Sequence, residues 1–251
     1  MDEKIIKQEV KQRYASVAQS AGAGCCEGSS CCSGDSVAYV SLVDYEDLNA
    51  ELPEGSNLGL GCGIPTSHAG LKFGETVLDL GSGAGVDVFL AAKAVGPVGK
   101  VIGVDMTPEM VDRAQENARK GDFRNVEFRL GEIETLPVES NSVDVVISNC
   151  VLNLVPNNSQ AFAEIYRVIK PGGRFAISDM VTFGDVPDDM RQDMVLWAGC
   201  VAGAVDQADY LDIIRTAGFT DVQVVKSTLY GADEPERPFG LASITVEGRK
   251  A

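Results

Sequence analysis

Hydrophobic and polar residues follow two different periods along this chain. From residue 75 onward, short apolar runs of strand length alternate with longer segments in which apolar residues recur with a helical period. Strands that alternate with helices favour a largely parallel sheet joined by right-handed crossovers. The pattern predicts strands at residues 76–80, 100–104, 125–130, 143–148, 173–178, 221–228 and 241–247, and helices at residues 84–95, 107–120, 158–169, 187–198 and 206–217.

The ends of these expected helices carry residues that start and stop helices. Thr107 is an expected N-cap, and Pro108 follows it at the first helical position. Helix 158–169 should end at Lys170-Pro171-Gly172-Gly173. Helix 206–217 begins with Asp206 and is followed by a glycine. We therefore expect an α/β fold of the Rossmann-like, doubly wound kind, with a mostly parallel seven-stranded sheet.

The first 74 residues differ from the rest in pattern. Residues 3–18 predict an amphipathic helix, because apolar side chains recur about every four residues at Ile6, Val10, Tyr14 and Val17. Residues 20–36 are dominated by Gly, Ser and Cys, which predicts a flexible loop that carries four thiols. Residues 37–74 read as a connector rich in turn residues. We expect residues 1–74 to pack on a single domain formed by residues 75–251.

Charge and composition exclude several classes of function. The 251 residues include 21 basic and 37 acidic side chains, a net charge of −16, which disfavours nucleic-acid and anionic membrane partners. The first residues are charged without an apolar targeting segment, and no apolar run of about 18 residues is present. We therefore expect a cytoplasmic protein, and we also expect a monomer. Thiols stay reduced in that compartment, and an odd count of 7 cysteines cannot pair completely.

Histidine is almost absent, since His68 is the only one. Histidine-based metal sites and Ser-His-Asp or Cys-His catalysis would all have to depend on this single residue. The seven cysteines need another explanation, such as core filler, metal ligation or chemistry of their own.

A glycine-rich turn follows the first expected strand. Gly81-Ser82-Gly83-Ala84-Gly85 leads from strand to helix, and Asp105 ends the next strand about 20 residues later, where a carboxylate can hold ribose hydroxyls. These features indicate a nucleotide-like ligand, either a dinucleotide or S-adenosylmethionine. The dinucleotide fingerprint would place glycine or alanine at position 86, where this chain has Val86. S-adenosylmethionine has no phosphate, so its loop needs only to leave room for the amino-acid part.

Two further short sequence motifs extend this pattern. Gly131-Glu132-Ile133 follows the third strand, and Pro171-Gly172-Gly173-Arg174 precedes the fifth. Together with the glycine turn they resemble the class I S-adenosylmethionine-dependent methyltransferases over about residues 75–180. That family often has Asp where this chain has Glu132, which would lie near the adenine amino group. The resemblance implies S-adenosylmethionine as methyl donor, bound by Asp79, Gly81, Ser82, Gly83, Gly85, Asp105, Met106, Glu132, Ile133 and Asn149.

Three cysteines lie far apart and outside the N-terminal loop. Cys150 follows the fourth strand, at the sheet edge where ligands bind. Cys62 and Cys200 lie in glycine-rich irregular segments, and none of the three has the close spacing of a zinc ligand pair. The sequence motifs that contain them are Gly59-Leu60-Gly61-Cys62-Gly63-Ile64-Pro65-Thr66, Ser148-Asn149-Cys150-Val151-Leu152-Asn153-Leu154 and Gly199-Cys200-Val201-Ala202-Gly203-Ala204.

These motifs resemble those of the arsenite methyltransferases, and the match covers about residues 55–225. The resemblance implies that Cys62, Cys150 and Cys200 bind trivalent arsenic, the substrate. It also implies an N-terminal cysteine that forms a disulfide during turnover, reset by thioredoxin or glutathione. Cys32 is our choice because it stands closest to the connector, and the other candidates are Cys25, Cys26 and Cys31.

The implied chemistry agrees with the residue types. Trivalent arsenic is soft and thiophilic, and three thiols can replace its three hydroxides. Its lone pair can then attack the sulfonium methyl group, so no general base is needed. The expected activity is arsenite methylation for arsenic detoxification.

Other readings stay open from the residues alone. The same core could methylate a small carbon or oxygen nucleophile, or the thiols could belong to a non-catalytic metalloid sensor. The spacing Cys25-Cys26 to Cys31-Cys32 fits a zinc or metalloid capture site, delivery or redox thiols, or residues without a function.

Overall fold

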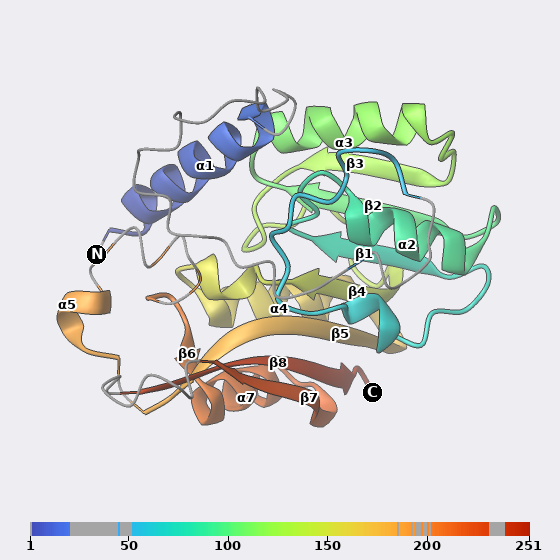
Figure 1. The fold of residues 1–251 in the computed structure, drawn as a ribbon. Helices are drawn as coiled ribbons and strands as arrows, with labels where there is room; N and C mark the ends of the chain where they lie inside the picture. The colour runs from blue at the N-terminus through green and yellow to red at the C-terminus, as the bar shows by residue number, and fades with distance from the viewer. Residues whose placement is uncertain are drawn as a thin grey trace.

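The computed structural model describes residues 2–20, 45, 52–184, 186–191, 193, 197, 200, 202–230 and 239–251. Its elements alternate between strand and helix from residue 76 onward, as the hydrophobic pattern predicts (Figure 1). The strands are β1 Thr76–Leu80, β2 Lys100–Asp105, β3 Val126–Leu130, β4 Val143–Asn149, β5 Ile169–Phe183, β6 Val205–Asp206, β7 Thr220–Tyr230 and β8 Gly240–Arg249. The helices are α1 Glu3–Ser20, α2 Val86–Val95, α3 Pro108–Lys120, α4 Asn158–Val168, α5 Asp188–Arg191 and α7 Gln207–Thr216, with 3-10 turns η2 Pro65–Ser67 and η3 Leu152–Leu154.

In the described residues the strands form one mixed sheet of eight strands, one more than expected: seven lie in the order β3-β2-β1-β4-β5-β8-β7, and the short β6 pairs with β5. Pairs from β3 to β5 are parallel, whereas β8 is antiparallel to both β5 and β7. The expected doubly wound, mostly parallel α/β fold is therefore confirmed. The strand order reverses direction between β1 and β4, and the carboxyl ends of those two strands are where such sheets bind ligands.

Both faces of the sheet are buried because side chains alternate between them. On β1, Leu78 and Leu80 pack with Phe162 of α4 and Tyr210 of α7 on one face. Val77 packs on the other face against α2. Burial on both faces explains why the strands read as nearly continuous apolar runs.

Several boundaries differ from the prediction. β5 begins at Ile169, directly after α4, so the residues expected as a break belong to the start of the strand, where the pairing with β4 shifts register. β6 is a two-residue strand that pairs with β5 and has no signal in the pattern because it is so short. Within the expected helix at 187–198, the described residues are helical at α5 and at Trp197, and not helical at Pro187 and Asp193. The division of the chain at residue 74 stays a prediction.

The expected helix starts are found. Thr107 is the N-cap of α3 and Pro108 its first residue, although the threonine side chain makes no capping bond. Asp206 caps α7 by accepting a hydrogen bond of 2.9 Å from the backbone N–H of Ala208.

Helix α1 packs beside α3 and reaches the carboxyl edge of the sheet (Figure 1). Ile6 and Val10 of the predicted apolar face are buried, and Tyr14 packs beside them. The Arg113 guanidinium of α3 donates 2.7 Å to the carbonyl of Ala18, near the end of α1. In the described part of the chain, no helix is both long enough and apolar enough to span a membrane.

Candidate active site

The turn between β1 and α2 has the conformation that its glycines predict. Gly81 has φ 63°, and a Cβ there would lie 2.4 Å from the Val151 side chain, so only glycine fits. Gly83 has φ 50°, and a Cβ there would meet nothing within 4 Å. Gly85 begins α2 as its N-cap. The backbone at Gly83 therefore faces open space in which a ligand can approach the main chain.

This open space is part of a cleft at the carboxyl ends of β1, β2 and β4. Nine of the ten residues expected to bind the cofactor line it, and Gly85 does not. The nine are Asp79, Gly81, Ser82, Gly83, Asp105, Met106, Glu132, Ile133 and Asn149. His68 follows η2 and is not among the lining residues. The strand order thus brings together sequence motifs that lie far apart along the chain.

Three carboxyl groups meet in the cleft. Burial raises the pKa of Asp79 well above its ordinary value, and repulsion from Asp87 and Asp105 adds to the rise. Burial also raises the pKa of Asp87 to about 6 and that of Asp105 above its ordinary value. Asp105 accepts hydrogen bonds from the N–H groups of Gly83 at 3.0 Å and Thr107 at 2.8 Å. Mutually repelling carboxyls in a buried cleft suit a ligand that brings positive charge.

Ser82 adds a second feature that fits a polar ligand. Its hydroxyl oxygen is buried and has no hydrogen-bond partner among the residues described. An unpaired buried hydroxyl costs free energy that a bound ligand recovers by hydrogen bonding.

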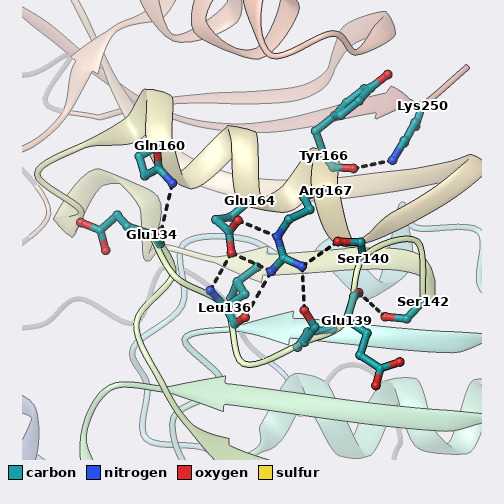
Figure 2. Close-up of polar contacts among 11 residues, drawn as sticks. Glu134, Leu136, Glu139, Ser140, Ser142, Gln160, Glu164, Tyr166, Arg167 and Lys250 are labelled. Carbon is teal, nitrogen blue, oxygen red and sulfur yellow. Dashed lines mark hydrogen bonds and ion pairs between the residues drawn. The ribbon is translucent and has the colours of Figure 1, made fainter.

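The loop after β3 also lines the cleft, and α4 holds it in place. Figure 2 shows the Arg167 guanidinium on α4 paired with Glu164 and directed at the loop. Arg167 donates to the backbone carbonyls of Leu136 at 3.2 Å and Val138 at 2.9 Å. Glu164 in turn accepts 2.8 Å from the N–H of Leu136, and Gln160 donates to the carbonyl of Glu134. These bonds fix the loop that carries Glu132 and Ile133.

Replacing Arg167 with methionine should lower the free energy of unfolding by about 2 kcal/mol, because two loop carbonyls and the Glu164 carboxylate lose their donor. Urea denaturation followed by circular dichroism measures the change. Arg215→Met is the matched control, since Arg215 forms an exposed pair with Asp212 on α7. The control should cost less than about 1 kcal/mol. Equal losses in the two variants would contradict the role given to Arg167.

Helix α1 forms part of the wall of the cleft, which the sequence alone did not indicate. Lys7, Val10 and Tyr14 of this helix line the cleft. The Lys7 ammonium pairs with Glu132 at 2.7 Å and with Glu134 at 2.9 Å. Glu132, expected near an adenine amino group, thus contacts a lysine of α1. The apolar period of α1 predicted a buried face but carried no signal for what that face covers.

The three dispersed cysteines come together beside the cleft. Cys62, Cys150 and Cys200 are buried free thiols and belong to one apolar group with Ile6, Val10, Leu154, Met180, Ala204 and Leu241, which we call the thiol cluster. Cys150 also lines the cleft itself. The described residues contain no set of three Cys, His, Asp or Glu side chains already arranged as a metal site. The thiols are therefore in contact without a completed ligand geometry.

The surroundings of Cys62 and Cys150 favour the neutral form of these two thiols. Contact with the thiols of Cys200 and Cys62, followed by burial, raises the pKa of Cys150 well above its ordinary value. Burial raises the pKa of Cys62, while its contact with Cys150 opposes the rise. A neutral thiol carries a proton, which the hydroxide ligand of an incoming metalloid would need in order to leave as water.

Asn149 connects the cleft to Cys62. Its side-chain oxygen accepts hydrogen bonds from the N–H groups of Cys62 at 3.1 Å and Gly63 at 3.2 Å. Its amide nitrogen donates to the Gly63 carbonyl at 2.7 Å, to the Tyr45 hydroxyl at 2.6 Å and to Asp87 at 3.1 Å. Tyr45 also donates 2.8 Å to Asp87. The residue expected to contact a cofactor therefore also fixes the turn that carries a thiol.

The four N-terminal cysteines, Cys25, Cys26, Cys31 and Cys32, lie outside the described residues. The disulfide expected for one of them stays a prediction.

Comparison with known proteins gives consistent results. Residues 71–218 match the methyltransferase domain family. The chain is 47% identical to an arsenite methyltransferase of Halobacterium salinarum, over 99% of this chain and 68% of that protein. It is 38% identical to the human arsenite methyltransferase, over 61% of this chain and 43% of the human protein.

Among solved structures, the chain is similar to an arsenic(III) S-adenosylmethionine methyltransferase from Chlamydomonas reinhardtii, with a TM-score of 0.69 and 38% identity. The match covers 76% of this chain and 68% of that one. The chain thus spans about two thirds of the Halobacterium and Chlamydomonas proteins and less than half of the human one.

Proposed function

This chain belongs to the arsenite methyltransferase family, and from that premise we propose that it transfers a methyl group from S-adenosylmethionine to trivalent arsenic. The observation that carries the proposal is the contact of three buried thiols beside a cleft lined by the glycine turn and by carboxyls. The family supplies the substrate class, and the chemistry of the two neighbouring sites supports it.

The cleft residues fit the methyl donor. S-adenosylmethionine supplies a methyl group on a positively charged sulfonium and also carries an ammonium group. Asp79, Asp87 and Asp105 form an acidic environment for a cation, and the open backbone at Gly83 leaves room beside the strand. Asp105 would hold the ribose hydroxyls, Glu132 would lie near the adenine, and the remaining lining residues would shape the pocket.

The thiol cluster fits the substrate. Arsenous acid exchanges its three hydroxides for the sulfur atoms of Cys62, Cys150 and Cys200, and each thiol proton leaves with a hydroxide as water. The arsenic keeps its lone pair, which becomes the nucleophile toward the methyl group. Because soft thiolates select soft centres, the ligand set favours arsenic over hard oxygen-bound ions. The enzyme contributes mainly position, which is worth up to about 7–11 kcal/mol in well-oriented systems.

Transfer of a methyl cation to the lone pair oxidises arsenic formally from the trivalent to the pentavalent state. Returning it to the trivalent state takes two electrons, which two cysteine thiols supply when they form a disulfide and release two protons. We propose Cys32 as the N-terminal partner in that disulfide. Thioredoxin or glutathione would reduce it, in the cytoplasm, where such reductants act. We further propose that the enzyme works as a monomer.

Purified protein with isotope-labelled S-adenosylmethionine, arsenite and a thiol tests the whole proposal. We expect labelled methylarsenical, detected by chromatography coupled to arsenic-specific mass spectrometry. Omission of arsenite should abolish the label in that fraction. Absence of labelled methylarsenical in the complete mixture would refute the activity.

The affinity for S-adenosylmethionine should rise with pH between about 5 and 7. Asp87 has a pKa of about 6, so below that value it is protonated and neutral, and above it carries a negative charge that attracts the cation. Burial raises this pKa, the hydrogen bonds donated by Asn149 and Tyr45 oppose the rise, and Asp79 is the neighbouring carboxyl that repels Asp87. Because the cation binds the ionised form better, we expect about tenfold weaker binding at pH 5 than at pH 7.

Isothermal titration calorimetry in buffers of different ionisation enthalpy measures both this affinity change and the protons released. Asp87→Asn should flatten the pH dependence. S-adenosylhomocysteine, which lacks the sulfonium charge, should show a smaller pH dependence than the donor. An affinity for the donor that does not change with pH would show that Asp87 has no electrostatic role.

A further inference from the structure

Two segments that carry cysteines are bonded directly to each other inside the thiol cluster. The loop after β4 carries Cys150 and continues into η3, whereas Cys200 lies in the segment before β6. The Asn153 amide nitrogen donates 3.1 Å to the carbonyl of Cys200. The Trp197 indole donates 3.4 Å to the carbonyl of Leu154, and the Cys200 thiol points at the Cys150 carbonyl at 3.8 Å. Asn153 is therefore a side-chain link between two of the three cysteine segments.

Asn153 is itself held by a buried carboxyl. The backbone N–H of Asn153 donates 3.0 Å to Asp179 on β5, and the Tyr210 hydroxyl of α7 donates 3.1 Å to the same oxygen. Asn153, Asp179 and Tyr210 are each 1% exposed. Burying a carboxyl in an apolar core is costly unless it is well hydrogen-bonded. Asp179 does not line the cleft, so its burial beside Asn153 and Tyr210 indicates a role in the structure around the thiols.

Both linked cysteines have an unusual backbone conformation. Cys150 and Cys200 have φ 59° and φ 65°, in the left-handed region that residues other than glycine rarely adopt. Such conformations persist when surrounding contacts over-determine them. After Cys200 the chain packs against the Asn153 backbone so closely that a Cβ at Gly203 would lie 2.1 Å from the Asn153 carbonyl oxygen. Contacts to Asn153 therefore hold Cys200 from both its carbonyl and its following residues.

We propose that Asn153, oriented by Asp179, is a positioning residue that holds Cys200 beside Cys150 for the capture of trivalent arsenic. This inference rests on the function proposed above. Capture breaks three arsenic–oxygen bonds and forms three arsenic–sulfur bonds, without any change of oxidation state. Asn153 does not touch the arsenic in this scheme. It reduces the ordering that Cys200 must undergo on binding, and such preorganisation increases affinity.

Arsenite protection of individual cysteines tests the proposal without turnover. The protein is incubated with arsenite and no methyl donor, alkylated with iodoacetamide, and analysed by peptide mass spectrometry. In the unmodified chain, arsenite should slow alkylation of Cys62, Cys150 and Cys200 alike. In Asn153→Ala it should still protect Cys62 and Cys150, whereas Cys200 should alkylate about tenfold faster than in the unmodified chain with arsenite.

Steady-state kinetics and binding supply a second readout. Asn153→Ala should raise the KM for arsenite about tenfold, while the Kd for S-adenosylmethionine stays within about twofold, because Asn153 does not line the donor cleft. Asn157→Ala is the matched control. Asn157 is a nearby amide that caps α4 by accepting 3.0 Å from Gln160, so its loss weakens the fold without contacting a thiol.

Asp179→Asn is the second variant, for use if Asn153→Ala does not fold. It keeps one oxygen acceptor and should give the same selective loss at Cys200 to a smaller extent. Full protection of Cys200 in a folded variant would overturn the positioning role, as would an equal loss in Asn157→Ala. Failure of arsenite to protect any cysteine in the unmodified chain would instead refute the proposed function.

Discussion

Cys150→Ser is expected to reduce arsenite methylation by at least about a thousandfold while leaving the affinity for S-adenosylmethionine within about twofold. Cys150 is the thiol in contact with both other cluster thiols, and it also lines the donor cleft. Serine preserves the shape of the side chain but presents a hard oxygen that binds trivalent arsenic poorly. Initial rates with labelled donor, together with calorimetric donor binding, measure the two effects separately.

Cys25→Ser is the control for this experiment, because it removes a thiol from the N-terminal segment instead of the cluster. It should retain arsenite binding at Cys62, Cys150 and Cys200. Turnover by Cys150→Ser at the unmodified rate would remove Cys150 from the site. Loss of donor binding in that variant would instead indicate that the substitution disturbs the cleft.

Asp105→Ala is expected to weaken S-adenosylmethionine binding by about 10- to 100-fold, because charge-assisted hydrogen bonds contribute about 1.5–3 kcal/mol. The substitution also leaves the N–H groups of Gly83 and Thr107 without their acceptor, so the glycine turn loses its shape. The expected result is the reverse of that for Cys150→Ser: arsenite still protects the cluster thiols, but the donor no longer binds well. Calorimetry for the donor and alkylation for the thiols distinguish the two.

Asp144→Ala is the matched control for Asp105→Ala. Asp144 lies at the start of β4, at the opposite end of the sheet from the cleft, and accepts hydrogen bonds from Thr76 and Lys170. Its removal changes the net charge equally and should lower stability without changing donor affinity. A similar loss of affinity in both variants would show that overall charge or stability, and not a contact at Asp105, is responsible.

The sequence predicted the fold and the cleft because both depend on local patterns. Each of these patterns depends only on neighbouring residues. They are the apolar runs of strand length, the glycines at 81 and 83, and a carboxylate at the end of a strand. The strand order then brings the glycine turn and the carboxylate to one edge of the sheet. Boundaries were less predictable where tertiary pairing extended a strand, as at Ile169, or where a strand was only two residues long, as in β6.

The thiol cluster depended on a resemblance, not on spacing. Cys62, Cys150 and Cys200 are too far apart in the chain for any ligand-spacing rule, and only the fold makes them neighbours. The polar residues that hold them were not predictable at all. Asn153 and Asp179 look like ordinary positions within apolar segments, and their roles depend on long-range partners such as Tyr210.

One helix contacts both sites. Lys7 on α1 pairs with the acidic loop of the donor cleft, while Ile6 and Val10 of the same helix pack among the cluster thiols. A ligand that shifts α1 at either site therefore changes the free energy of binding at the other. Such coupling is reciprocal by thermodynamic necessity, so whatever factor the methyl donor applies to the arsenite affinity, arsenite applies to the donor affinity. Under the proposed function, a methyl donor and an arsenite that both shift α1 would each act as an effector of the other's binding.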